Sequence, residues 1–187
     1  MLLRACILPA ARLQRTDTAS SPSMFRRAKL NTVFTGIDGR PTLGCLNSTV
    51  FDGMVFDGCT FVMGHNSNVI AGALTIRNST FDFSQTDEDM AGNAINVYAQ
   101  TGKMVFTDNT FILNRNGQRG INLTWADWAL GEYDASDVTI SGNRFEGVAS
   151  DCAIRIVATP GYWTNCDVEQ LQADNDLNGG AIEVVTE

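Results

Sequence analysis

The segment VTISGNRF (138–145) repeats a pattern that also occurs, without a gap, in MVFDGCTF (54–61), LTIRNSTF (74–81) and MVFTDNTF (104–111). Each copy has two apolar residues separated by one spacer, then two turn-forming residues, a small polar residue or cysteine, another spacer and a phenylalanine. The alternation predicts a strand with one buried face, followed at once by a turn. We expect the phenylalanines to form a ladder in the core: Phe61, Phe81, Phe111 and Phe145.

A second strand pattern lies between these segments, in AINV (94–97), GINL (120–123), AIRI (153–156) and AIEV (181–184). Its alternation predicts another half-buried face. Residues 48–51 and 68–72 are candidates for the same strand in the first two repeats, and ADNDL (173–177) resembles a fifth turn. The unequal spacing of the phenylalanines favours a solenoid whose side loops differ in length over a β-sandwich.

Stacking explains why such repeats fold together. One repeat of about 20 residues cannot bury its own apolar face, whereas stacked repeats place like side chains on like. We therefore predict an all-β solenoid of about five to six coils over residues 41–187. The side chains at the small polar position are expected to form a second ladder that satisfies turn backbone groups, namely Cys59, Ser79, Asn109 and Asn143.

The sequence VTISGNRFEG, with LTIRNSTF and MVFTDNTF upstream, resembles the coils of right-handed parallel β-helix proteins. That superfamily includes pectate lyases, polygalacturonases and phage tailspikes, and the likeness extends over about residues 45–187. The resemblance implies a right-handed parallel β-helix, most like a phage virion structural protein. It implies little about activity, because the shared motifs are scaffold positions.

Charge divides the chain into a basic start and an acidic remainder. Residues 1–40 carry seven bases and two acids, so the other residues carry six bases and nineteen acids. We predict an extended N-terminal arm, residues 1–40, that docks on an acidic surface such as a neighbouring subunit. A solvated tail is the alternative. The arm-docking residues are Arg4, Arg12, Arg15, Arg26, Arg27 and Lys29.

The five cysteines show no spacing typical of a metal cluster. Free buried thiols are one interpretation, and a bridge between Cys152 and Cys166 is the other. The lone histidine, His65, has no flanking nucleophile, which is more typical of a structural or exposed residue. We expect no metal and no cofactor.

Catalysis on a β-helix needs either paired carboxylates or a base beside a cation site. The loop acids are Asp82, Asp87, Glu88, Asp89, Asp127, Glu132, Asp134 and Asp137. These form no recognisable catalytic motif, and acids on so acidic a chain are usually solvated. Arg155 should project outward, as a lyase base does, but so does any outward strand residue. We assign no catalytic residue.

A cluster of large aromatic residues is the most distinctive feature of the loops. Its members are Trp125, Trp128 and Tyr133, followed one coil later by Tyr162 and Trp163. Such rings can stack on sugars, anchor a protein interface or form a local core, and the sequence leaves all three open.

These features favour a non-enzymatic virion structural protein: a capsid decoration protein, head fibre or small spike. We expect a homo-trimer that attaches through its arm to other virion or assembly proteins, with no nucleic-acid partner. The last predicted strand lacks a polar capping segment, so we expect a partner chain to cover it. No apolar run is long enough to span a membrane. The alternative is an extracellular carbohydrate-binding or polysaccharide-degrading β-helix domain, which predicts converging acids beside Trp125 or Trp163.

Overall fold

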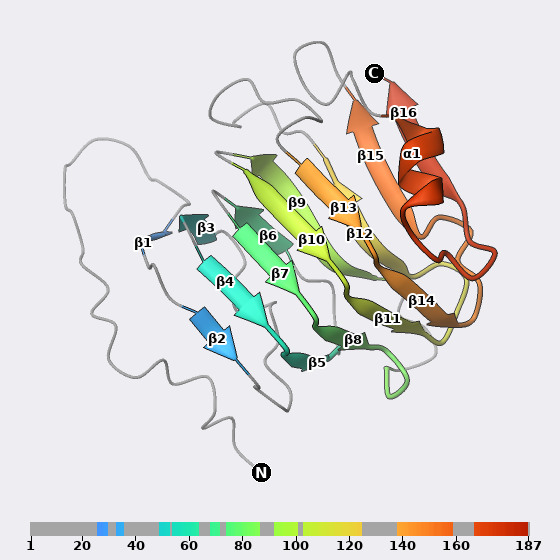
Figure 1. Ribbon diagram of the computed structural model, residues 1–187, viewed down its shortest axis with the longest axis horizontal. Helices are drawn as coiled ribbons and strands as arrows, with labels where there is room; N and C mark the ends of the chain where they lie inside the picture. Colours follow the sequence, from blue (N-terminus) through green and yellow to red (C-terminus); the bar gives the residue numbers. More distant parts are fainter. Residues whose placement is uncertain are drawn as a thin grey trace.

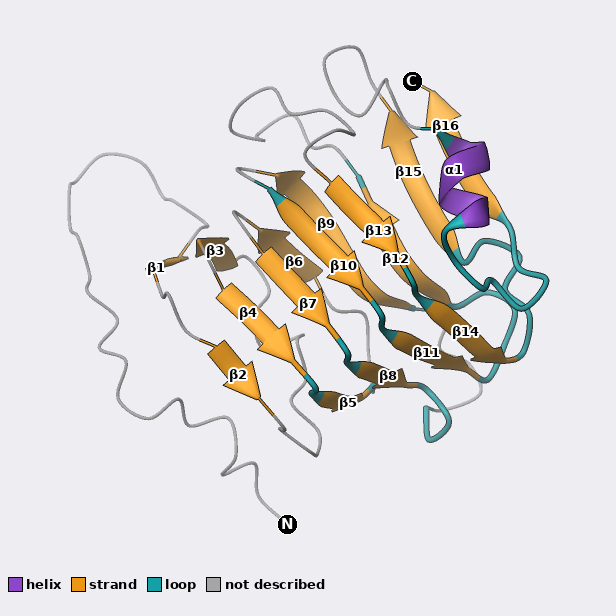
Figure 2. Ribbon diagram, viewed as in Figure 1, coloured by secondary structure: helices purple, strands orange, loops and turns teal. Residues whose placement is uncertain are grey.

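The computed structural model describes residues 26–29, 33–35, 49–52, 54–63, 68–71, 74–86, 92–100, 103–124, 138–158 and 167–186. Within these ranges the chain forms sixteen β-strands and one short helix, α1 (Val168–Ala173). Figure 2 shows strands side by side over most of the described chain, with α1 beside the last of them. The predicted all-β class is confirmed, and α1 is an addition to it.

The strands form three sheets, and every described strand pair is parallel. The seven-stranded sheet has the order β1 (Arg26–Lys29), β3 (Thr49–Asp52), β6 (Asn68–Ala71), β9 (Asn93–Gln100), β12 (Arg119–Leu123), β15 (Ile154–Ala158) and β16 (Ile182–Thr186). The five-stranded sheet has the order β13 (Val138–Ser141), β10 (Met104–Thr107), β7 (Leu74–Arg77), β4 (Met54–Asp57) and β2 (Val33–Thr35). The four-stranded sheet has the order β14 (Arg144–Gly147), β11 (Thr110–Leu113), β8 (Thr80–Asp82) and β5 (Thr60–Val62).

From β3 to β14 the chain visits the three sheets in rotation, one strand in each (Figure 1). Each round adds a strand beside the corresponding strand of the previous round. The four-stranded sheet is in register throughout, with Phe111 of β11 aligned with Phe81 of β8 and Phe145 of β14, whereas the register shifts once between β6 and β9. The segments predicted as the second strand pattern all belong to the seven-stranded sheet. The sequence patterns therefore located the strands correctly.

The corner between the five-stranded and four-stranded sheets has one conformation in every described round. A residue with positive φ comes first: Gly58 (64°), Asn78 (51°), Asp108 (56°) and Gly142 (66°). Glycine adopts this left-handed region freely, and asparagine and aspartate tolerate it better than other residues do. The backbone conformation thus explains the second turn-forming residue of each copy.

The four phenylalanines of the pattern stack on one another. Their ring centroids are 4.7 Å apart for Phe61 and Phe81, 5.1 Å for Phe81 and Phe111, and 4.8 Å for Phe111 and Phe145. These distances match the roughly 4.8 Å between neighbouring strands. Gly120 lies against this stack, because a Cβ there would be 2.5 Å from the Phe145 ring. The stack is buried among aliphatic side chains of all three sheets.

The predicted polar ladder runs beside the aromatic one. The backbone N–H of Cys59 donates to Ser79 Oγ (3.1 Å), that of Ser79 to Asn109 Oδ1 (3.0 Å) and that of Asn109 to Asn143 Oδ1 (3.1 Å). Asn175, in the predicted fifth turn, continues the series by accepting from the Asn143 N–H (3.1 Å). These side chains satisfy corner N–H groups that would otherwise be buried without a partner.

Helix α1 stands where the rotation would place a strand of the five-stranded sheet. It follows β15, and the corner at Asn175 and a single bridge from Asp176 to Arg144 come next. Asn175 Nδ2 donates to the Leu171 carbonyl of α1 at 2.7 Å, whereas Asn143 Nδ2 donates to the next asparagine. Residues 174–176 thus lie along the outer edge of β14. The predicted lack of a capping segment concerned the last strand, β16, which is the edge strand of the seven-stranded sheet, so its covering by a partner chain stays a prediction.

The segment predicted as an arm contributes two strands. β1 pairs with β3, and β2 pairs with β4. The side chains of Arg26, Arg27 and Lys29, and all of residues 1–25, lie outside the described residues. Arm docking and the domain boundary at residue 40 stay predictions.

Candidate functional site

One row of side chains on the seven-stranded sheet is polar throughout its described part. It holds the aligned residues Asn96 of β9, Asn122 of β12, Arg155 of β15 and Glu183 of β16. Their chain neighbours lie in the core, as Ile121 and Ile154 do, or pack against it, as those of Glu183 do. Because side chains alternate along a strand, the row lies on the opposite face of the sheet. We name these four residues the polar row.

The two asparagines of the polar row are buried although they face away from the core. Asn96 is 3% exposed and Asn122 is 7% exposed. Asn122 Nδ2 donates to Asn96 Oδ1 at 2.6 Å. The Oδ1 atom of Asn122 is buried and has no hydrogen-bond partner among the described residues. Buried polar atoms are rarely left unpaired, so this oxygen is the strongest indication of a bound group such as a water or a ligand donor.

The charged half of the polar row is an ion pair. Arg155 Nε lies 3.0 Å from Glu183 Oε2, and the side chains are 28% and 48% exposed, respectively. Arg155 does project from the sheet, but it is held by a carboxylate of the neighbouring strand. An exposed pair of this kind stabilises the fold little. The pair places one fixed positive charge and one fixed negative charge on this face of the sheet, with Arg155 aligned beside Asn122.

A buried thiol adjoins this pair. Cys152 Sγ lies 3.6 Å from Glu183 Oε2 and donates to the Ile154 carbonyl at 3.5 Å. Burial raises the pKa of the Cys152 thiol, and a hydrogen bond from Arg119 opposes that rise only in part. The group is therefore a neutral thiol near pH 7 and a poor nucleophile. Cys152 is not in a disulfide, in line with the free-thiol interpretation.

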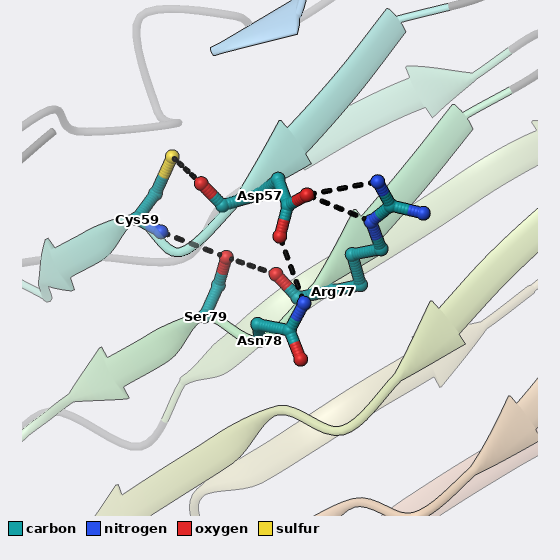
Figure 3. Close-up of polar contacts among 5 residues, drawn as sticks. All are labelled: Asp57, Cys59, Arg77, Asn78 and Ser79. Carbon is teal, nitrogen blue, oxygen red and sulfur yellow. Dashed lines mark hydrogen bonds and ion pairs between the residues drawn. The ribbon is translucent and has the colours of Figure 1, made fainter. Parts of the chain in front are cut away.

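A second polar cluster lies at the corner of the first two described rounds, on another face of the molecule (Figure 3). Asp57 accepts from Arg77 Nε (2.9 Å) through one oxygen and from Asn78 Nδ2 (2.8 Å) through the other. The hydrogen bonds from Asn78 and then from Arg77 lower the pKa of the Asp57 carboxyl. Both carboxylate oxygens of Asp57 are bound to side chains of the next round, so this cluster ties one round to the next.

Most of the residues predicted as a site lie outside the described chain. These are the aromatic residues Trp125, Trp128, Tyr133, Tyr162 and Trp163, together with His65, Cys166 and the loop acids other than Asp82. Asp82 accepts from the Ser84 N–H at 2.7 Å and stabilises a turn. The roles proposed for the residues outside the described chain stay predictions.

Sequence analysis did not single out the polar row, although a signal was present. The segments AINV and GINL carry asparagine at the same position, and AIRI and AIEV carry a charged residue there. That coincidence identifies one outward row once the strands are known to be in register. No group of three potential metal-ligating side chains gathers in the described part of the chain. No helix there is long and apolar enough to cross a membrane.

Comparisons with models of protein families, with curated proteins and with solved structures found no match to this chain.

Proposed function

We propose that the protein is a right-handed parallel β-helix that serves as a non-enzymatic structural component of a larger assembly. A virion protein of the decoration, head-fibre or small-spike type, assembled as a homo-trimer, is the form that we favour. The parallel pairing and the rotation among three sheets support the β-helix part. Repeats of this kind are stabilised by contacts with their neighbours, so a stack behaves as a stiff rod.

The observation that carries the proposal is the continuity of the two ladders. Four rings stack at 4.7–5.1 Å, and five corner residues are linked by side chain to backbone hydrogen bonds. Charged side chains on two faces also pair between neighbouring strands, as Arg77 does with Asp57 and Arg155 with Glu183. Much of the described polar chemistry thus holds one repeat on the next, which suits a spacer or support.

Attachment through the N-terminal arm follows from the charge division of the chain. Residues 1–40 have a net charge of +5 and the remainder has −13, from the counts given above. Oppositely charged surfaces attract one another over about 10 Å at ordinary salt. A basic arm from one subunit is therefore suited to dock on the acidic body of another.

The test compares the full chain with a variant lacking residues 1–25, which keeps β1 and β2. We expect light scattering to give a trimer for the full chain and smaller species for the variant. A peptide of residues 1–25 should bind the shortened protein, and more weakly as salt rises. A control peptide with Arg4, Arg12 and Arg15 replaced by glutamine should not bind. A full chain that is a stable monomer, with no salt-dependent peptide binding, contradicts the proposal.

Carbohydrate binding is a second candidate, and the partly exposed pair of Arg155 and Glu183 in the polar row favours it. A sugar hydroxyl can donate to the Glu183 carboxylate and accept from Arg155. Calorimetric titration with neutral and acidic oligosaccharides tests this function. Glu183→Leu and Arg155→Leu should each weaken binding, whereas Arg77→Leu, at the corner cluster, should not. Equal binding by all three variants excludes the polar row as the site.

A further inference from the structure

Two turns of the described chain contain asparagine followed by glycine. In one, the Gln118 N–H donates to the Arg115 carbonyl at 3.4 Å, across Asn116 and Gly117. In the other, the Gly180 N–H donates to the Leu177 carbonyl at 2.8 Å, across Asn178 and Gly179. An Asn–Gly peptide can cyclise because glycine has no Cβ to keep its nitrogen away from the preceding side chain. The two turns hold their asparagines very differently.

The Asn178 turn is tied down. Asn178 Nδ2 donates to the Gly147 carbonyl at 3.1 Å, and its N–H donates to Asp176 Oδ1 at 3.3 Å. Both central residues have positive φ, 51° for Asn178 and 76° for Gly179. Two consecutive left-handed residues closed by a hydrogen bond form a type I′ turn, in which Asn–Gly is the favoured pair. The backbone has little freedom to bring the Gly179 nitrogen onto the side chain.

The Asn116 turn leaves its amide free to react. Asn116 is exposed, and neither its side chain nor the Gly117 N–H makes a hydrogen bond within the described residues. The closing bond is the longer of the two, and Gly117 does not have a positive φ. The Asn116 side chain is therefore open to water, and no hydrogen bond among the described residues holds it or the Gly117 N–H away from cyclisation.

We propose that Asn116 is a site of spontaneous deamidation and that Asn178 is not. The Gly117 nitrogen attacks Cγ of Asn116, forming a C–N bond and a cyclic imide. The bond from Cγ to the amide nitrogen breaks, and ammonia leaves with the proton that the Gly117 nitrogen gives up. Water then opens the imide at either carbonyl, which yields aspartate or isoaspartate. No oxidant or other reactant is required.

The modification alters contacts between two loops. The Asn116 carbonyl accepts from the Asp151 N–H at 2.9 Å. The Ser150 hydroxyl lies 3.2 Å from the same carbonyl but is nearer to the Gln118 carbonyl, to which it donates. Ser150 Oγ also accepts from the Cys152 N–H at 3.1 Å. Isoaspartate lengthens the main chain by one carbon and displaces that carbonyl. The loop that holds Cys152 then loses its bond from the Asp151 N–H, and we expect the Cys152 thiol to become more accessible.

Mass spectrometric peptide mapping of the full-length protein, incubated at mildly alkaline pH, tests the proposal. The peptide containing Asn116 should gain about 1 Da and split into two chromatographic forms, while the Asn178 peptide stays unchanged. Gly117→Ala should slow the reaction about tenfold or more, since a Cβ hinders the attack. In guanidinium chloride both asparagines should react, because unfolding removes the hydrogen bonds that hold Asn178. Equal rates at the two sites in the folded protein, or an intact Asn116 under conditions that convert the unfolded chain, overturn the proposal.

Discussion

Replacing Asn143 by alanine removes a central member of the polar ladder. Asn143 is 1% exposed, and its Oδ1 accepts from the N–H (3.1 Å) and Nδ2 (3.0 Å) of Asn109. Its Nδ2 donates to the Phe106 carbonyl (2.9 Å) and to Asn175 Oδ1 (2.9 Å). The substitution leaves the Asn109 N–H buried without its acceptor, at about 1–3 kcal/mol, and removes three further bonds of about 1 kcal/mol each. We expect the free energy of unfolding to fall by about 4–6 kcal/mol.

Asn143→Asp separates hydrogen bonding from volume. The acid keeps the acceptor oxygen but, when ionised, places a buried charge against the Phe106 carbonyl. Burial should raise the pKa of this carboxyl in the folded state above its unfolded value of about 3.9. The protonated form, which can donate, prevails below that unfolded value, and its stabilisation is lost as pH rises through the folded pKa. Measured against the unsubstituted protein at each pH, the variant should recover stability toward pH 4 and be weakest near pH 7.

Urea unfolding followed by circular dichroism and by tryptophan fluorescence measures these changes. Two probes are needed because a repeat protein can lose part of its stack first. Asn116→Ala, on the exposed turn, is the matched control and should lie within about 0.5 kcal/mol of the unsubstituted protein. A loss below about 1 kcal/mol for Asn143→Ala would refute the view that the ladder satisfies otherwise orphaned corner groups.

Substitutions at Phe111 and Gly120 and alkylation of Cys152 test three further features of the fold. Phe111→Ala opens a cavity between two stacked rings and should cost about 3–5 kcal/mol in urea unfolding, with Phe111→Leu costing clearly less; equal costs would exclude a volume effect. Gly120→Ala should cost about 1–3 kcal/mol because the new Cβ meets the Phe145 ring, and an unchanged urea midpoint would contradict that contact. Since the pKa of Cys152 is raised, its alkylation in the folded protein should be slow at pH 7, speed up above pH 9 and become fast at pH 7 in denaturant. Rapid reaction of folded Cys152 at pH 7 would show that the thiol is not buried.

Local pattern was enough to predict the strands and the corners. The positive-φ position requires glycine, asparagine or aspartate in each described round, so Gly58, Asn78, Asp108 and Gly142 were visible as turn signals. The phenylalanine three residues later has one inward direction available once its strand is set. Parallel strands in register then place the same position of each repeat side by side. For this reason the aromatic stack could be predicted from the sequence.

The candidate site was harder to predict because it depends on which strands are neighbours. Asn122 and Arg155 are 33 positions apart in the sequence, and their alignment appears only when β12 and β15 pair. Burial of Asn96 and Asn122 likewise cannot be predicted from polar residues that alternate with apolar ones, since that pattern normally indicates an exposed face. The aromatic loop drew attention instead, because large rings are conspicuous in a sequence.

The amino-acid sequence by itself determined the repeat, its strands, its corners and its stacked phenylalanines. Each of these depends on the conformational range of a single residue or on a period of two along a strand. Only the tertiary structure decided that α1 takes the place of a strand, that Asn175 ends its ladder on the Leu171 carbonyl, and that Arg155 is held by Glu183. Those outcomes depend on contacts between residues of different repeats, whose energies arise only when the repeats lie together.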